Sequence, residues 1–347
     1  MPVPSPFHEA RSYTPAQVAC YRGAHLPLCF GDPAAEYAAA VESAALIDRS
    51  DRGLLVARGP DRASWLHALV SNAVRTLDLH AGNYAFALDQ RGRVLFDLNV
   101  MCLPDALWLD IDRAALPGAM THLERYLIIE DVLLQDRGDD WARLGFCGPA
   151  AAALAVEFGA GQAAAMPALA SAWLSDDVLL VRHDFAGPPG FELFVPPGRA
   201  AAIWDELAAR GARPAGLTAL DALRIEHGIP WLGRDIDEQV VAPETGQVER
   251  AISYHKGCYL GQEIVERMRS YGSLARRLVR VECDADADLA PPLPLRQAER
   301  EVGRLTSLVR HPSRPVRVGL AYLRTTVVET DGITAGDPPC AVRALPG

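Results

Sequence analysis

Residues 253–263, which read SYHKGCYLGQE, bring several groups that could do chemistry into one short segment. Cys258 lies between two glycines, and His255 and Lys256 come just before it. A helix is predicted from Gln262 to Ser270, so Cys258 would precede a helix N-terminus. The positive end of a helix and nearby cations both stabilise a thiolate. The pattern therefore predicts a reactive or ligand-binding thiol, and the alternative is a buried, inert cysteine.

Lys256 is the single lysine among the 34 basic residues of the chain. An ammonium group is a compact point charge, unlike the planar guanidinium of arginine. The exception indicates a site that arginine would not serve, although chance is the other explanation. Residues 250–280 carry seven basic and two acidic residues in a chain of net charge −10. This local basic region is suited to carboxylates or phosphates, or it is an ordinary solvated face.

Two carboxylates on expected strands are further candidates. In the segment 93–100, Asp97 alternates with apolar residues, so it lies on the face opposite to them. There it could orient an amine or accept a proton, or it could face water at a strand edge. Glu192 also alternates with apolar neighbours and has aromatic surface beside it. Such a carboxylate can recognise the amino-pyrimidine edge of a flat heterocycle by paired hydrogen bonds.

Composition excludes several classes of protein. Half of the 347 residues are hydrophobic and no apolar run approaches the roughly 20 residues that span a bilayer, so a globular protein that does not enter a membrane is expected. The acidic net charge makes a nucleic-acid partner unlikely. The seven cysteines are scattered without a CxxC pair, which predicts neither a disulfide framework nor a metal site. No secretory signal is visible, so we expect a cytoplasmic protein.

Hydrophobic periodicity predicts an α+β fold, because helices alternate with hairpins along the chain. Helices are expected at 32–47, around 66–70, at 116–127, 199–210, 218–227 and 262–270. Strands are expected at 54–57, 84–88, 93–100, 107–111, 178–185, 191–195, 278–283, 302–309, 318–323 and 340–343. The predicted organisation is an irregular arm over 1–29, two lobes over 30–275 with a boundary near 145–175, and a small β-barrel over 276–347.

The segment Lys256-Gly257-Cys258-Tyr259-Leu260-Gly261-Gln262-Glu263 resembles the K-G-C-Y-x-G-Q-E signature of YgfZ-type folate-binding proteins. These proteins are relatives of the glycine-cleavage T-protein, an aminomethyltransferase, and of a mitochondrial iron–sulfur assembly factor. Residues 45–59, 84–97, 185–195, 217–230 and 302–323 resemble further family segments in the same order. The resemblance implies a T-protein-like ring of lobes around a central folate channel, with the region 30–275 binding tetrahydrofolate.

The resemblance also implies roles for single residues. Asp97 matches the T-protein aspartate that acts at the folate nitrogen, Tyr84 a folate-contacting tyrosine and Glu192 the pterin-binding glutamate. Cys258 matches the signature cysteine, with Lys256 beside it. Further expected folate contacts are Arg224, Tyr259 and Gln262. The chain departs from T-proteins at Phe96-Asp97, where they have two aspartates, at Gly187-Pro188-Pro189-Gly190, where they have Gly-Glu-Asp-Gly, and at Asp110-Ile111-Asp112, where they have an asparagine-containing strand end. T-proteins also lack the cysteine signature.

Three functions are compatible with these residues. The first is a tetrahydrofolate-binding accessory protein for iron–sulfur cluster assembly or repair, with Cys258 as a functional thiol and iron–sulfur proteins as partners. The second is a folate-dependent one-carbon transferase of the aminomethyl or methyl type, in which Asp97 assists the folate nitrogen. The third is a thiol enzyme without folate, in which His255 serves Cys258 as a base.

Overall fold

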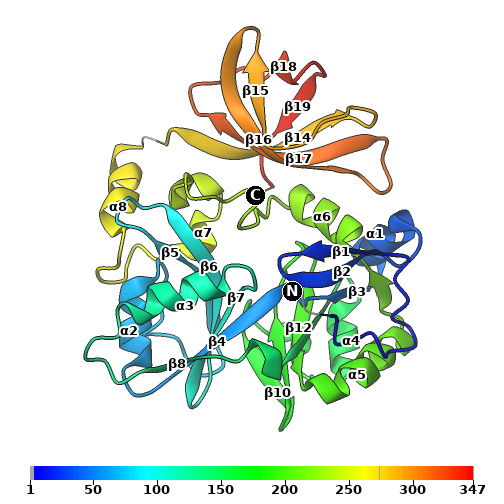
Figure 1. The fold of residues 1–347 in the computed structure, drawn as a ribbon, viewed down its shortest axis with the longest axis vertical. Coiled ribbons are helices and arrows are strands. Elements are labelled where there is room, and N and C mark those ends of the chain that lie inside the picture. The colour runs from blue at the N-terminus through cyan, green and yellow to red at the C-terminus, as the bar shows by residue number, and fades with distance from the viewer. Residues whose placement is uncertain (1–3, 273, 347) are drawn as a thin grey trace.

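The computed structural model describes residues 4–272 and 274–346. Figure 1 shows the three larger sheets at three corners of the molecule, with helices packed against them. The first two sheets lie side by side, and the C-terminal sheet covers one end of both. In the part of the chain that is described, no helix has the length and apolar character needed to cross a membrane. The mixture of helices and mainly antiparallel sheets confirms the predicted combination of α and β structure.

The first lobe is a five-stranded antiparallel sheet in the order β5-β6-β7-β4-β8. Its strands are β4 (Arg52–Arg58), β5 (Gly82–Leu88), β6 (Val94–Cys102), β7 (Ala106–Asp112) and β8 (Leu133–Asp136). Helices α2 (Arg62–Leu69) and α3 (Leu116–Glu124) bury apolar side chains against one face, which includes Phe96 and Leu98. The other face carries Tyr84 and Phe86 and packs toward the other two sheets. This second face therefore points at the centre of the molecule.

The second lobe is a six-stranded sheet in the order β10-β11-β12-β9-β3-β13. Its strands are β3 (Ala45–Asp48), β9 (Ala142–Cys147), β10 (Ser171–Ser175), β11 (Val178–Arg182), β12 (Gly190–Val195) and β13 (Arg213–Ala215). Helices α4 (Ala151–Glu157) and α5 (Pro197–Ala209) cover one face around Trp204, and the short helix η2 (Ala163–Ala165) follows α4. Because β3 precedes the first lobe in sequence and pairs with β9, the first lobe is an insertion within the second.

The passage from the first to the second sheet differs from the expected boundary near 145–175. The chain leaves β8 at Asp136, turns through η1 (Gly138–Asp140) and enters β9 at Ala142. The reason is that residues 142–147 form a central strand of the second sheet, flanked by β12 and β3. A strand that is buried throughout carries no alternation of polar and apolar residues, so its start was not visible in the sequence.

The expectation of an irregular arm over residues 1–29 is corrected by the structure. Strands β1 (Gln17–Tyr21) and β2 (Ala24–Cys29) form an antiparallel hairpin. Its two-residue turn holds Arg22 and Gly23 at φ +51° and +82°, and such positive φ values at both turn positions match the twist of a hairpin. Upstream, Phe7 and Tyr13 pack on Trp204, so this part of the arm is also ordered by apolar contacts.

Helix α1 (Pro33–Glu42) begins where the Asp-Pro pair predicts, because Asp32 accepts a hydrogen bond from the Ala34 amide at 3.0 Å. It ends five residues before the predicted end at Ile47, which lies in β3 instead. After the second lobe, α6 (Leu217–Glu226) runs toward the C-terminal sheet. The chain then returns to the first lobe through η3 (Ala242–Thr245), α7 (Val248–Ala251) and α8 (Gln262–Tyr271).

The C-terminal domain is a curled, six-stranded antiparallel sheet in the order β18-β15-β16-β17-β14-β19. Its strands are β14 (Arg276–Asp284), β15 (Leu293–Gln297), β16 (Arg300–Arg310), β17 (Val316–Arg324), β18 (Ile333–Ala335) and β19 (Cys340–Arg343). The curl encloses an apolar core around Leu295, Leu305 and Leu323. The sheet is a half-barrel rather than the expected barrel, since no ladder joins β18 to β19 among the described residues.

Candidate functional site

Asp97 and Tyr84 meet on the face of the first sheet that points at the centre of the molecule. The Tyr84 hydroxyl donates a hydrogen bond of 2.8 Å to Asp97 Oδ2. The other oxygen, Asp97 Oδ1, is buried and has no hydrogen-bond partner among residues 4–272 and 274–346. Buried polar atoms in proteins are nearly always hydrogen-bonded. Asp97 Oδ1 is therefore an acceptor that a bound ligand could use.

Tyr84 is held firmly in this position. Asn72 donates hydrogen bonds to the carbonyls of Tyr84 and Arg250, at 2.8 and 2.9 Å. The guanidinium of Arg250 lies over the Tyr84 ring, 4.2 Å from its centroid. Burial, followed by the charge of Asp97, raises the pKa of Tyr84 well above its ordinary value. Tyr84 thus keeps its proton and acts as a permanent donor to Asp97.

A buried set of charges joins the first two lobes beside this pair. We call it the inter-lobe network, and its members are Arg49, Arg52, Asp110, Arg143 and Glu192. Arg52 on β4 donates to both oxygens of Asp110 on β7, at 2.9 and 3.1 Å. Arg143 on β9 donates to Asp110 at 2.9 Å and to Glu192 on β12 at 2.8 Å. Arg49 binds the other oxygen of Glu192 at 2.6 Å. The network therefore connects β4 and β7 of one sheet to β9 and β12 of the other.

Asn99 of the first sheet links the strand that carries Asp97 to the inter-lobe network. Asn99 lies two residues from Asp97 on the same face of β6, and it donates to Asp110 Oδ2 at 2.7 Å. Burial opposes the ionisation of Asp110 and Glu192, but the arginines outweigh it and hold the pKa of both carboxyls below the ordinary values. Both groups therefore stay charged at neutral pH, and the arginines stay bound to them.

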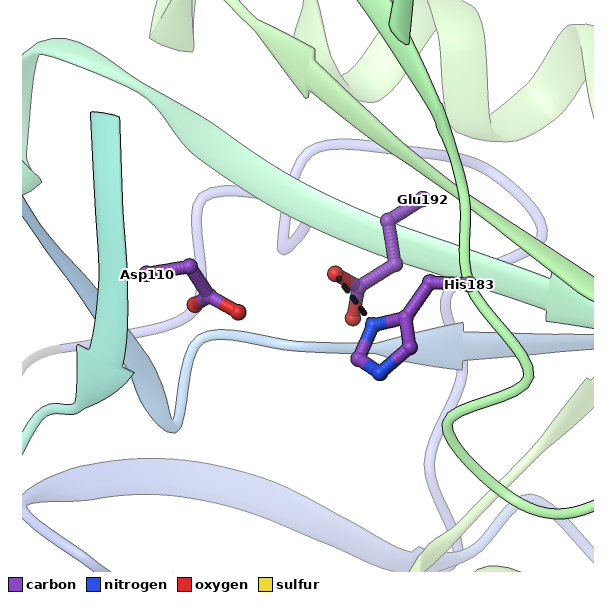
Figure 2. A group of neighbouring side chains, drawn as sticks. All are labelled: Asp110, His183 and Glu192. Atoms are coloured by element: carbon purple, nitrogen blue, oxygen red, sulfur yellow. Dashed lines mark ion pairs between the residues drawn. The ribbon is translucent and has the colours of Figure 1, made fainter. Parts of the chain in front are cut away.

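Three groups of this region have the chemistry of metal ligands. Figure 2 shows Asp110, His183 and Glu192, whose ligand atoms lie within 4.8 Å of one another. His183 Nδ1 is 3.2 Å from Glu192 Oε2, and burial lowers the pKa of His183. Each carboxylate, however, is already bonded to two guanidinium groups of the network. These positive charges oppose a cation, so the set serves as internal ion pairing.

A cavity of about 260 Å³ opens beside the network. Arg52, Arg143 and Trp141 line it together with Pro4 and Pro6 of the N-terminal segment. Two network arginines are thus accessible from this cavity, whereas Asp97 is not among its lining residues.

Lys256 is buried and satisfies three backbone carbonyls. Its Nζ donates to the carbonyl oxygens of His67, Val70 and Asn72, the last at 3.0 Å. The first two acceptors lie at the C-terminal end of α2, where the last carbonyls of a helix have no internal partner. Burial lowers the pKa of Lys256 to about 7. The structure therefore gives Lys256 the role of an anchor that ties its loop to α2.

Cys258 is exposed, as is Gly257, on the loop that Lys256 anchors. Tyr259 next to it is buried, and its ring lies 4.8 Å from Lys256 Nζ. Gln262, at the start of α8, accepts a hydrogen bond of 3.3 Å from the Tyr259 amide. The loop thus presents the thiol outward from two buried anchors, and in the described part of the chain no hydrogen bond joins Cys258 to His255.

Arg224 lies in a different environment from the other expected folate contacts. Its side chain is fully buried, with ion pairs to Asp221 at 2.7 Å and to Asp235. It also donates to Ser307 of β16 at 2.8 Å and lies over the Trp231 ring. Arg224 therefore links α6 to the C-terminal sheet. The structure does not bring it to Asp97.

Comparison with known proteins places the chain. A family model described as the GCVT N-terminal domain matches residues 7–256. The chain belongs to the GcvT family. An aminomethyltransferase of Rubrobacter xylanophilus is 28% identical over 99% of this chain and 92% of the relative. An aminomethyltransferase of Bordetella avium is 30% identical over 70% of this chain and 68% of the relative.

The fold of this GcvT-family chain matches that of a solved relative. The crystal structure of the glycine cleavage system aminomethyltransferase T from Bartonella henselae superimposes with a TM-score of 0.86. The match covers 99% of this chain and 97% of that protein at 19% identity. The chain therefore has the T-protein fold.

Apart from Arg224, the residues selected from the sequence fall into three groups in this fold. Tyr84 and Asp97 form one hydrogen-bonded pair. Lys256, Cys258, Tyr259 and Gln262 share the anchored loop. Glu192 lies in the inter-lobe network with both oxygens bound by arginine, so a pterin could use it only by sharing or displacing a guanidinium.

Sequence reasoning missed the arginines that neutralise the central carboxylates. Arg52, Arg143 and Asp110 each lie in a strand whose residues are almost all buried. The signal that could have revealed them is a charged residue inside a run of apolar residues, because a buried charge requires an opposite partner. The identity of each partner depends on pairing between distant strands, which the sequence does not display.

Proposed function

We propose that this chain is a tetrahydrofolate-dependent one-carbon transferase of the aminomethyltransferase type. The observation that carries the proposal is the buried Oδ1 of Asp97, which lies beside the Tyr84 hydroxyl and has no hydrogen-bond partner among the residues that the structure describes. A carboxylate fixed through one oxygen can accept a proton or a hydrogen bond from a ligand N–H through the other. The names of the relatives, which are aminomethyltransferases, support the same reaction class.

In this proposal the chain's own residues divide the work. Asp97 Oδ1 would orient the reacting N–H of the folate and would accept its proton as the one-carbon donor transfers its carbon to that nitrogen and releases its amine. Tyr84 holds Asp97 in one rotamer through the 2.8 Å bond to Oδ2. Arg52 is close enough for its charge to interact with Asp97, but its N–H groups are bound to Asp110. Asp97 Oδ1 consequently remains open to the ligand instead of being covered by an arginine.

Tetrahydrofolate, when bound, would supply the nucleophilic nitrogen that accepts the one-carbon unit. The residues at Asp97 fit such a ligand, because they offer a buried acceptor that no other described residue binds. Glu192 fits less well, because its oxygens already accept hydrogen bonds from Arg49 and Arg143. We therefore assign Asp97 and Tyr84 to the ligand and Glu192 to the support of the network.

The Asp97→Asn variant tests the reaction. We expect kcat for one-carbon transfer from a methylamine-type donor to fall by about 100-fold or more, as is typical when a general base is removed. The dissociation constant for tetrahydrofolate, measured by tryptophan fluorescence, should change only a few fold. Asp105→Asn is the matched control, since Asp105 is an exposed aspartate of the same lobe. Full turnover in Asp97→Asn would contradict the role of Asp97.

A second candidate function rests on a separate observation, the outward thiol of Cys258 on a loop with buried anchors. In this reading the chain is a YgfZ-type accessory protein that binds tetrahydrofolate in the centre of the molecule and serves iron–sulfur proteins through Cys258. An exposed thiol near a helix N-terminus is suited to transient disulfide or ligand chemistry with such partners.

The Cys258→Ser variant separates the two functions. If the accessory function holds, this variant binds tetrahydrofolate normally but fails to restore iron–sulfur enzyme activity in cells that lack the protein. Cys20→Ser, which removes another exposed thiol, should restore the activity fully. Full rescue by Cys258→Ser would exclude a role for its thiol, while turnover with a one-carbon donor would remain informative about Asp97.

A further inference from the structure

Cys283 and Cys340 face each other in the C-terminal sheet, far along the chain from the signature cysteine. Cys283 lies on β14 and Cys340 on β19, and the antiparallel register pairs them directly. Opposed residues of antiparallel strands have Cα atoms about 4.5 or 5.5 Å apart. Both spacings fall within the roughly 4.4–6.8 Å that disulfides require. Both thiols are free in the structure, and their pairing allows a disulfide to form without a change of strand register.

The two thiols also interact chemically. Interaction with Cys283 lowers the pKa of Cys340, whereas interaction with Cys340, followed by burial, raises the pKa of Cys283. The thiolate is the species that attacks a disulfide, so Cys340 is the better first nucleophile. The side chains are 4% and 5% exposed, but both residues line a surface cavity of about 640 Å³. This cavity gives a small reagent access to the pair.

We propose that Cys283 and Cys340 form a redox site that closes to a disulfide on reaction with a low-molecular-weight disulfide such as oxidised glutathione. The Cys340 thiolate attacks one sulfur of oxidised glutathione, and one glutathione thiolate leaves. Cys283 then gives up its proton and attacks the Cys340 sulfur, which releases the second glutathione. The protein loses two hydrogen atoms with two electrons, and oxidised glutathione is reduced to two glutathione molecules.

The bridge would restrain β19, whose following residues contact the rest of the molecule. Beyond β19, Leu345 packs so closely on Gly246 that a Cβ there would lie 2.5 Å from its Cδ1. Arg280 binds the carbonyls of Ala344 and Glu226, at 3.1 and 2.8 Å. A disulfide at Cys340 closes a long loop back to β14, which reduces the freedom of the unfolded chain. Oxidation is therefore expected to raise the thermal midpoint.

The experiment is oxidation of the full-length protein with oxidised glutathione, followed by non-reducing peptide mapping and thermal unfolding. We expect the peptides that contain Cys283 and Cys340 to be recovered as one linked species, with an intact mass lower by two hydrogen atoms. The thermal midpoint should rise on oxidation and return on reduction. Cys340→Ser should lose the linked species and the rise, whereas Cys20→Ser, an exposed cysteine elsewhere, should keep both.

A stable glutathione adduct on Cys283 or Cys340 without any linked peptide would overturn the proposal. The same holds for a link between other cysteines, or for an equal rise of the thermal midpoint in Cys340→Ser. The peptide map of the unsubstituted protein decides the question even if the variant fails to fold. Because Cys283 and Cys340 lie in the C-terminal sheet, the result of the oxidation experiment is independent of the outcome for Asp97 or Cys258.

Discussion

Lys256 shows why one position of an arginine-rich chain is lysine. Its three N–H groups diverge from one nitrogen and reach three carbonyls in separate directions. A guanidinium presents its donors in one plane and needs more space, so it cannot satisfy the same three acceptors. The loop geometry thus explains why a lysine occupies position 256, and it also determines where Cys258 reaches the surface.

Replacement of Lys256 should therefore destabilise the fold. Lys256→Met leaves three buried carbonyls without a donor, and we expect the free energy of unfolding to fall by about 2–3 kcal/mol. Lys256→Arg should also be destabilising, because the planar group does not fit. Urea unfolding near pH 6 is the suitable measurement, since the pKa of about 7 leaves the ammonium protonated there.

The control for Lys256 is Arg267→Met, which removes an exposed charge from α8. It should change the free energy of unfolding by less than about 0.5 kcal/mol. Equal stability of Lys256→Met and the unsubstituted protein would contradict the anchoring role.

The β5–β6 hairpin and the start of α8 support each other. Gly92 in the hairpin turn has φ +73°, and a Cβ there would lie 3.0 Å from Ile264. Gly261 before α8 has φ +82°, and a Cβ there would lie 2.5 Å from the Asp89 carbonyl oxygen. These two close approaches place the hairpin against the cysteine loop. The hairpin that includes the strand of Asp97 is thereby packed directly against the loop that carries Cys258.

Gly261→Ala should weaken this junction, since both the backbone conformation and the lack of space oppose a side chain. We expect a loss of about 1–3 kcal/mol in the free energy of unfolding, with faster amide hydrogen exchange in the hairpin. Gly257→Ala is the matched control in the same loop, because a Cβ there meets nothing within 4 Å. Comparable losses in the two variants would show that the junction is not the cause.

Elements with local signals could be predicted from the sequence, and elements that depend on distant pairing could not. Helix α1 was marked by its Asp-Pro start, and the β5–β6 hairpin by alternation on both sides of a turn that contains Gly92. By contrast, β3 was predicted as the end of a helix, because residues 45–47 are apolar and their strand character comes only from pairing with β9 and β13. The same limit applied to the site, where Tyr84 and Asp97 were selected separately but the arginine partners of Glu192 were not.

Buried ion pairs of the inter-lobe network hold the two lobes together. Arg143 of the second lobe binds Asp110 of the first lobe as well as Glu192 of its own sheet, so the second lobe neutralises a buried charge of the first. Breaking a buried pair from one side leaves an uncompensated charge, which costs about 3–5 kcal/mol. The relative position of the lobes, and with it the surroundings of Asp97, therefore depends on keeping all members charged.

This dependence predicts sensitivity to acid. The arginines hold the pKa of Asp110 and Glu192 below the ordinary 3.8 and 4.5. The contribution of these two carboxylates to the free energy of unfolding is therefore complete above pH 4.5 and is lost as the pH falls below that value. Glu192→Gln should lower the free energy of unfolding by about 3 kcal/mol at neutral pH. On acidification, the free energy of unfolding of this variant should fall by less than that of the unsubstituted protein. Urea unfolding at neutral pH and near pH 3.5 measures both effects.

The control for the acid experiment is Glu206→Gln, on the exposed side of α5. The free energy of unfolding of Glu206→Gln should equal that of the unsubstituted protein at both pH values. An identical loss of stability in Glu192→Gln and the unsubstituted protein would show that the network is not what acid disrupts.

The insertion of the first lobe has a consequence for how the chain is made. As the polypeptide leaves the ribosome, β3 emerges early but cannot form its ladder with β9 until about a hundred further residues have been synthesised. In the described part of the chain, the strands β4 to β8 form ladders only with one another, so they can close while β3 is still without a partner. The segment synthesised between β3 and β9 is thus expected to fold before the sheet that brackets it.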